Sequence, residues 1–372
     1  MSEGPPRLNP RRGGPWLSLG AVALAFALLP LFMPDGSFDL YPFAGARLPL
    51  HAGFVDLATT ILVFALFALG FNLLFGHTGE LSFGHAMFFA LGAYATALFT
   101  KGFDIMLGPA HLQFAGSGNA LFALAIALGV VALWAWLLAR LIVPRSSGIY
   151  YSMITLAFAQ VVYFVAFRWS DLTGGEDGLQ AIARPQLPGL PPGWLADSTH
   201  FYEAAAVVAF VAVALNYWIV NSNFGSVLRA IRENKQRARF LGYDVNKYRV
   251  NAFVLSALFP AVGGWIWTYF QQSINPDAGS VDYSGRVVMM ALLGGINTFA
   301  GPMLGAFVYW DLQNRFARFD RFWPEIIGLV FVFFVLLAPR GIAGGLEDLR
   351  RYGIQAVFRR APARRDAEEP QP

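Results

Sequence analysis

Three ionisable side chains lie close together between two long apolar runs of the sequence: His77, Glu80 and His85. A charge in apolar surroundings costs several kcal/mol unless it is paired or hydrated. Their His-x-x-Glu-x-x-x-x-His spacing matches no zinc motif. Three roles therefore stay open: a proton relay, the end of a broken helix beside a solute route, or side chains at a wet interface. We predict the broken helix, because helix ends and unwound backbone bind the charged groups of solutes in transporters.

A second glycine-rich segment, Gly294–Gly305, is similar to the segment Gly76–Gly92 that holds these side chains. Each joins a glycine-rich turn to a methionine-containing run that ends in Leu-Gly-Ala. Paired segments interrupted by Gly or Pro are the sequence sign of broken helices around a transport site. The residues predicted to border the translocation path are Glu80, Ser82, His85, Gly294, Gly295 and Asn297.

A basic segment, Asn221–Leu241, lies between two apolar runs and has the pattern of an amphipathic helix. Its apolar residues recur at helical spacing, at Val227, Ile231, Ala238 and Leu241. Ser222 or Asn223 can cap its start, and Gly242 suits a left-handed C-terminal turn. We predict a short helix whose apolar face meets a partner. The alternative is a basic loop held to anionic lipid head groups.

The composition places these segments in a membrane protein. Of 372 residues, 56% are hydrophobic and 13% are charged, whereas a soluble protein carries about 25% charged residues. The chain has no cysteine, which excludes disulfides and thiolate metal sites. The net charge of +4 is small and its basic residues cluster in loops, a pattern that indicates membrane topology and not nucleic-acid binding.

Apolar runs long enough to cross about 30 Å of hydrocarbon recur along the chain. They are Trp16–Met33, Leu57–Phe75, Leu81–Phe99, Leu121–Ala139, Ile149–Phe167, Tyr202–Val220, Val250–Tyr269, Val287–Tyr309 and Trp323–Ala338. The first run lacks a small-residue cleavage site and is expected to be retained. The runs do not alternate in polarity as β-barrel strands do. We predict an all-α polytopic membrane protein with roughly eight to ten transmembrane helices, some of them broken or re-entrant.

Basic residues in the loops predict the orientation. Residues 1–15, the coupling segment 221–249 and a partly disordered tail, 350–372, are expected in the cytoplasm, and the loop 168–200 outside; residues 16–349 form the transmembrane domain. Simple alternation of the runs then leaves Trp323–Ala338 ending outside, which its basic tail forbids. A break or re-entrant turn near Gly76–Glu80 or Gly294-Gly295 is therefore required.

Several stretches resemble the permeases of branched-chain amino acid ABC importers, of the LivM type. They are FGHTGELSFGHAMFFALGAY, TGGEDGL, FGSVLRAIRENKQRARFLGYDVNKYRVNAFVLSA, LLGGINTFAGPMLGAF and LAPRGIAGG. The resemblance runs from about Phe54 to Leu349 in the order found in that family. Urea-type ABC permeases are close relatives, so the resemblance leaves urea and short amides open beside amino acids.

The resemblance implies an importer-type ABC permease of the bacterial inner membrane with both termini cytoplasmic. It implies as partners a homologous permease subunit, two cytoplasmic ATPase subunits, a periplasmic solute-binding protein and membrane lipid. The residues expected to couple to the ATPase are Val227, Arg229, Ile231, Arg232, Glu233, Ala238, Leu241 and Gly242. The sequence has no G-x-x-x-x-G-K-S/T motif, so ATP hydrolysis belongs to another chain. No catalytic residue, cofactor or metal is expected.

Two alternatives to this reading stay open: an ion-coupled secondary transporter that uses Glu80 or the histidines, and a passive channel. The sequence also departs from the family at Lys235, where an acidic residue is common. This lysine is expected to make the coupling face more basic and the cognate ATPase surface more acidic.

Overall fold

The computed structural model describes residues 54–316, apart from 108–109, 186–190, 192 and 297. It also describes 37–39, 47–49, 341–345 and a few single positions between 325 and 336. The predicted run Trp16–Met33, most of Trp323–Ala338 and both tails lie outside the described residues.

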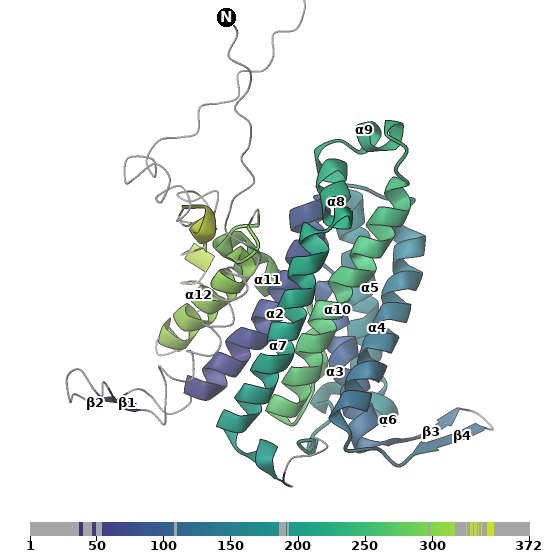
Figure 1. The fold of residues 1–372 in the computed structure, drawn as a ribbon. Helices are drawn as coiled ribbons and strands as arrows, with labels where there is room; N and C mark the ends of the chain where they lie inside the picture. Colours follow the sequence, from purple (N-terminus) through teal and green to yellow (C-terminus); the bar gives the residue numbers. More distant parts are fainter. Residues whose placement is uncertain are drawn as a thin grey trace, which may run out of the picture.

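Long helices dominate the described part, as predicted (Figure 1). They are α2 (Phe54–Thr78), α3 (His85–Lys101), α4 (Ala120–Ile142), α5 (Ile149–Arg168), α7 (Ser198–Asn221), α10 (Val245–Gln271), α11 (Val281–Gly294) and α12 (Gly301–Phe316). Among the described residues, five stretches are long and apolar enough to cross a membrane: Val55–Thr78, Ala120–Ile142, Ile149–Arg168, Ser198–Asn221 and Val245–Gln271. The prediction of an all-α, multi-pass membrane protein is confirmed.

Short elements lie at the two ends of the long helices. The helical ones are α6 (Ser170–Thr173), η1 (Gly175–Asp177), η2 (Trp194–Ala196), α8 (Asn223–Glu233), α9 (Lys235–Phe240) and η3 (Pro276–Gly279). Two antiparallel hairpins pair β1 (Ser37–Asp39) with β2 (Arg47–Pro49) and β3 (Phe103–Leu107) with β4 (Ala110–Phe114). Helices α8 and α9 lie at one end of the bundle, and α6 and the β3–β4 hairpin lie at the other (Figure 1).

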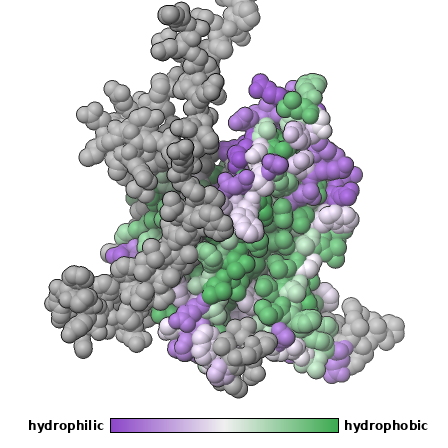
Figure 2. Space-filling view, in the orientation of Figure 1, coloured by the Kyte–Doolittle hydropathy of each residue, from purple (hydrophilic) through white to green (hydrophobic). Residues whose placement is uncertain are grey.

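The long helices divide into an inner and an outer group. In the most apolar window of α2, 89% of the residues are buried within the protein, against 28% for α4 and α5. The outer helices instead expose large apolar side chains, among them Leu133, Trp136, Tyr150, Val207 and Trp218. Figure 2 shows these apolar surfaces as a band between polar ends. A band of exposed apolar side chains between polar ends is what a lipid bilayer covers.

Small residues let α10 approach the inner helices closely. A Cβ atom placed on Gly264 would lie 2.2 Å from the carbonyl oxygen of Phe89 in α3, and one on Gly70 of α2 would lie 2.6 Å from Pro260. Close backbone contact through small residues is the usual way that membrane helices pack, because lipid removes most of the hydrophobic drive between them. The inner helices α2, α3 and α10 therefore form a tight framework.

The predicted run Val287–Tyr309 is a hairpin of two short helices and not one span. A Cβ on Gly294 would lie 1.7 Å from the carbonyl oxygen of Gly301, and one on Gly305 would lie 1.8 Å from that of Met290. These contacts pair α11 and α12 antiparallel. At 1.5 Å per residue each helix is about 20–25 Å long, shorter than the hydrocarbon core. A hairpin returns the chain to the side from which it came, so the chain is interrupted at Gly294-Gly295, one of the two predicted positions. The crossing count stays a prediction, because Trp16–Met33 and most of Trp323–Ala338 lie outside the described residues.

Candidate functional site

The α2–α3 break, residues 79–84, is the other predicted interruption, and glycine creates it. Gly79 has a left-handed φ of +74°, which favours glycine over other residues. Gly84 then precedes α3, and its N–H donates to the Ser82 hydroxyl at 3.3 Å. The Ser284 hydroxyl, in α11, accepts a hydrogen bond from the N–H of Ala86 at 3.2 Å. The break is thus a fixed turn held by its own and neighbouring side chains.

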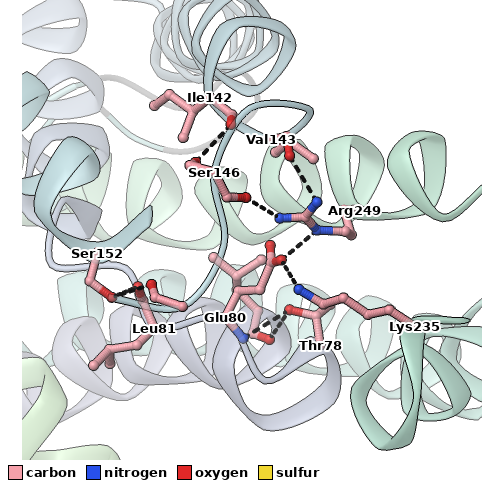
Figure 3. A network of polar contacts seen from close by, with 11 residues as sticks. Thr78, Glu80, Leu81, Ile142, Val143, Ser146, Ser152, Lys235 and Arg249 are labelled. Carbon is pink, nitrogen blue, oxygen red and sulfur yellow. Dashed lines mark hydrogen bonds and ion pairs between the residues drawn. The ribbon is translucent and has the colours of Figure 1, made fainter. Parts of the chain in front are cut away.

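Glu80 lies in this break and is tied to two basic residues, one from α9 and one from α10 (Figure 3). Its Oε1 accepts from Lys235 Nζ at 3.0 Å and from Arg249 Nε. The side chains of Glu80 and Arg249 are 2% and 5% exposed, whereas Lys235 is 36% exposed. The other carboxylate oxygen, Oε2, is buried and has no hydrogen-bond partner among the described residues.

Arg249 connects the same carboxylate to the turn after α4. Its Nη1 donates to the carbonyl oxygen of Val143 at 2.8 Å, and its Nη2 donates to that of Ser146 at 2.9 Å. The guanidinium therefore satisfies carbonyls at a helix end and neutralises a buried charge at once. Removing one partner of a buried ion pair leaves an uncompensated charge, which costs about 3–5 kcal/mol. The Glu80–Arg249 pair fixes the break to α10 and the α4–α5 turn.

Helix α8 contacts the end of α2 through Arg232. The Nη1 of this side chain donates to the carbonyl oxygen of Gly76 at 2.5 Å. A Cβ placed on Gly79 would lie 3.1 Å from Arg232 Cγ, so the aliphatic part of the arginine covers the glycine. Arg229, by contrast, donates to the carbonyl oxygen of Val220 at 3.0 Å, in the same connection. Of the predicted coupling residues, Arg232 is the one with a direct contact to the break.

The apolar side chains of α8 and α9 are covered within this chain. Val227, Ile231 and Ala238 are buried against Val245 at the start of α10 and against the partly buried Tyr248. These three side chains therefore need no separate partner to cover them, and their coupling to an ATPase stays a prediction. Lys235, expected to face an ATPase, instead points to Glu80. Both contacts arise because the segment folds back onto the end of the helix bundle. The helical spacing of apolar residues within the segment does not show this.

The predicted single helix Asn221–Leu241 is interrupted at Asn234. That residue is extended, and its side chain accepts from the N–H of Arg237 to cap α9. Ser222 caps α8 by accepting from the N–H of Gly225, as predicted. Gly242 has the left-handed φ of +88° that was expected at the C-terminal turn.

The outward surface of the segment carries exposed apolar side chains. Phe240 is 90% exposed and Leu241 is 70% exposed, with the exposed Arg237 and Arg239 beside them. The exposed Glu233 ends α8. Leu241 was among the residues predicted to couple to an ATPase, whereas Phe240 was not. The sequence signal for Phe240 is an aromatic residue two positions before Gly242, within a basic segment.

The second glycine-rich turn lies beside the end of α2. Asn72 Nδ2 donates to the carbonyl oxygen of Thr298 at 3.3 Å. A Cβ on Gly76 would lie 2.8 Å from the carbonyl oxygen of Ile296. Gly295 has a left-handed φ of +109°. The second break thus lies against the last turns of α2, at the end of the bundle that carries α8; the predicted path residue Asn297 lies outside the described residues.

The three ionisable residues at the first break do not form one site. His85 is buried among Phe71, Phe88 and Phe253, and its Nε2 lies 3.2 Å from Ser256 Oγ. Since the Ser256 hydroxyl donates to the carbonyl oxygen of Phe253, it is left to accept from the imidazole. His77 instead lies 3.2 Å from the carbonyl oxygen of Asn72. Of the three, Glu80 forms an ion pair with the α8–α9 segment, through Lys235.

Comparison with known proteins finds a family whose model covers the residues described above. Residues 53–338 match the model of the permease component of branched-chain amino acid transport systems. The high-affinity branched-chain amino acid transport system permease protein LivM of Escherichia coli is 26% identical over 326 residues, covering 81% of this chain and 71% of that protein. The corresponding LivH protein of Salmonella typhimurium is 24% identical over 300 residues, covering 76% and 92%.

A third relative gives the same result. The probable branched-chain amino acid transport permease protein LivM of Methanocaldococcus jannaschii is 25% identical over 285 residues, covering 68% of this chain and 80% of that protein. No solved structure gives a significant match. The family match includes both glycine-rich breaks and all of α8 and α9. The chain therefore belongs to the family of branched-chain amino acid transport permeases.

Proposed function

We propose that this chain is the transmembrane subunit of an ATP-driven importer for branched-chain or related amino acids. The observation that carries the proposal is the family match over residues 53–338, which spans the membrane helices together with the α8–α9 segment. Relatives whose names assign them to branched-chain amino acid transport indicate the solute class. The ATPase subunits, a second permease subunit and a periplasmic solute-binding protein complete the proposed assembly.

The proposed orientation places the α8–α9 end of the bundle in the cytoplasm, with both termini. The opposite end, with residues 168–200, faces the periplasm. The basic residues of 221–249 support this assignment, as does the separation of α8–α9 from α6 and the β3–β4 hairpin (Figure 1). The solute-binding protein then meets the α6 end, and ATP-driven motion enters at the α8 end.

The ATPase is proposed to dock on the outward surface of the segment, formed by Phe240 and Leu241 with Arg237 and Arg239. Exposed aromatic side chains beside arginines have the composition of protein-interaction hot spots. Ile231, in contrast, is completely buried within this chain. A charge at Ile231 would destabilise the permease itself, so docking has to be tested at Phe240.

The solute route is proposed to pass the two breaks, bordered by Ser82, His85 and the Gly294–Gly295 turn. Interrupted helices that meet at one end of a bundle are typical of the cavity-lining parts of transporters. The contacts of Asn72 with Thr298 and of Gly76 with Ile296 support a shared site, because they hold the second turn against the end of α2, from which the first break begins.

Reconstitution tests the proposed function. The permease is purified with its bound subunits and placed in proteoliposomes that enclose ATP, with the solute-binding protein and radiolabelled leucine outside. We expect uptake that requires both enclosed ATP and the binding protein. Unlabelled isoleucine and valine should compete, whereas urea should not.

Two results would contradict the proposal. Uptake without ATP that collapses when the proton or sodium gradient is dissipated would identify a secondary transporter. Uptake of urea that needs neither ATP nor an ion gradient would identify a passive channel.

A further inference from the structure

The cytoplasmic segment and the α2–α3 break are far apart in the sequence but touch through two side chains. Arg232 at the end of α8 donates to the carbonyl oxygen of Gly76, and Lys235 at the start of α9 pairs with Glu80. The residues joined are 156 and 155 positions apart. Both links leave from the short stretch around Asn234, so they fasten the junction of α8 and α9 and not one helix alone.

The two cations on Glu80 have unequal positions. Arg249 is almost completely buried with the carboxylate, whereas Lys235 reaches it from a partly exposed position. Separating the buried pair would leave a charge without compensation, so Arg249 is expected to stay with Glu80 in every state. Lys235 can exchange its contact with Glu80 for water at lower cost, because its side chain is 36% exposed. Glu80 is thus anchored by α10 and connected by Lys235 to the segment that leads to the docking surface.

Gly79 brings the backbone of the break directly against α8. Because the glycine lacks a Cβ, the methylene groups of Arg232 lie over it. The apolar cover of Gly79, the hydrogen bond to Gly76 and the ion pair at Glu80 hold the segment at three neighbouring positions of the chain. A displacement of the α8–α9 junction would pull the break with it.

We propose that Glu80 is a positioning residue that couples the α8–α9 segment to the α2–α3 break through Lys235, so that both move as one body during transport. This inference rests on the proposed function, since it assigns the place where ATP-driven motion enters the membrane helices. Glu80 does not bind the solute in this account. Its carboxylate is committed to Arg249 and Lys235.

The first test replaces Lys235 in the purified, reconstituted complex. Lys235→Met removes the link and leaves the buried Glu80–Arg249 pair intact. We expect an assembled complex with basal ATP hydrolysis near wild type, and solute uptake per ATP reduced roughly tenfold, within the usual range of coupling free energies. Lys235→Arg keeps the cation and should restore coupling. The control is Lys247→Met, at an 81% exposed lysine paired with Asp244 on the surface, which should couple normally.

The second test locks α8 to the break. A Cβ on Gly79 would lie 4.0 Å from that of Arg232, within the range of about 3.5–4.5 Å for a disulfide. The chain has no native cysteine, so Gly79→Cys with Arg232→Cys forms a defined bridge. If both parts move as one body, the oxidised and reduced forms will import equal amounts of solute per ATP. Comparing two redox forms of one variant removes the backbone strain at Gly79 from the result.

Two outcomes would overturn the inference. One is wild-type coupling in Lys235→Met; the other is uptake that stops on oxidation of the cysteine pair and returns on reduction. Failure of the proposed function looks different, because the wild-type complex itself would then show no ATP-dependent uptake.

Discussion

The two breaks in the membrane helices are built from different physical contacts. The α2–α3 break contains a buried carboxylate and is held by side chains that come from α8, α9 and α10. The α11–α12 break is held by backbone contacts among Gly294, Gly301 and Gly305. The side chains at the first break connect it to the α8–α9 segment, whereas at the second break any added Cβ would overlap a backbone oxygen. The first break is thus suited to coupling and the second to rigidity.

Removing the charge partner of the first break should have the largest effect. Arg249→Met leaves Glu80 with Lys235 alone and leaves the Val143 and Ser146 carbonyls without their donor. We expect a loss of about 3–5 kcal/mol of stability, measured as a lower thermal midpoint of the detergent-purified permease. The control, Arg237→Met at an exposed position, should match wild type. An unchanged midpoint for Arg249→Met would mean that the buried ion pair does not form.

Adding one methyl group at the second break should have the next largest effect. Gly305→Ala places a Cβ 1.8 Å from the carbonyl oxygen of Met290, and the hairpin must open to accept it. Overpacking of this kind costs about 1–3 kcal/mol. Gly285→Ala on the same hairpin is the matched control, because nothing lies within 4 Å of its Cβ. Equal thermal midpoints for the two variants would contradict the close helix contact.

The apolar side chains of the α8–α9 segment are buried on one face and exposed on the other. A change on the exposed face should weaken binding of the ATPase and leave the stability of the permease unchanged. Phe240→Asp changes a residue that is 90% exposed, so the permease should remain as stable as wild type. Loss of an aromatic anchor should weaken ATPase binding by about 1–2 kcal/mol or more, measured by copurification and titration. Gln236→Asp on the same helix is the control for added charge. Full ATPase binding by Phe240→Asp would place the docking surface elsewhere.

The surface ion pair between Asp244 and Lys247, at the start of α10, should contribute least to the stability of the permease. Asp244 caps α10, and its hydrogen bond from the Lys247 N–H lowers the pKa of the carboxyl below its usual value. A lowered folded-state pKa stabilises the protein above the unfolded value near 3.8 and loses this contribution as the pH falls through the folded pKa. Asp244→Ala should therefore be slightly less stable at pH 7, and the difference should shrink toward pH 3. A difference that grows on acidification would reverse the assigned sign.

Much of the fold follows from local pattern. The run Leu121–Ala139 falls within α4 and Ile149–Phe167 within α5, because lipid selects apolar length and helices satisfy their own backbone. The caps were equally local: Ser222 and Gly242 act within a few residues of their own positions. The distribution of charge required a break near Gly76–Glu80 or Gly294-Gly295, but the sequence did not show which of the two it was, nor the glycine contacts that pair α11 with α12.

The candidate site was predicted only in part, because its contacts are distant in sequence. Glu80 was identified as an unusual charge, but Lys235 and Arg249 lie 155 and 169 positions away. No periodicity in a single sequence joins such positions. The burial of Ile231 was missed for the same reason: an amphipathic helix shows that one face is covered, and not which surface covers it.

The most direct test of this account is the side of the membrane on which the α8–α9 end lies. Without native cysteines, single probes at Gln236 and Ala196 report the two ends separately. A membrane-impermeant maleimide should label Ala196→Cys in intact cells and Gln236→Cys only after the membrane is permeabilised. Labelling of Gln236→Cys in intact cells, with Ala196→Cys protected, would place the segment outside the cytoplasm and contradict its coupling to an ATPase.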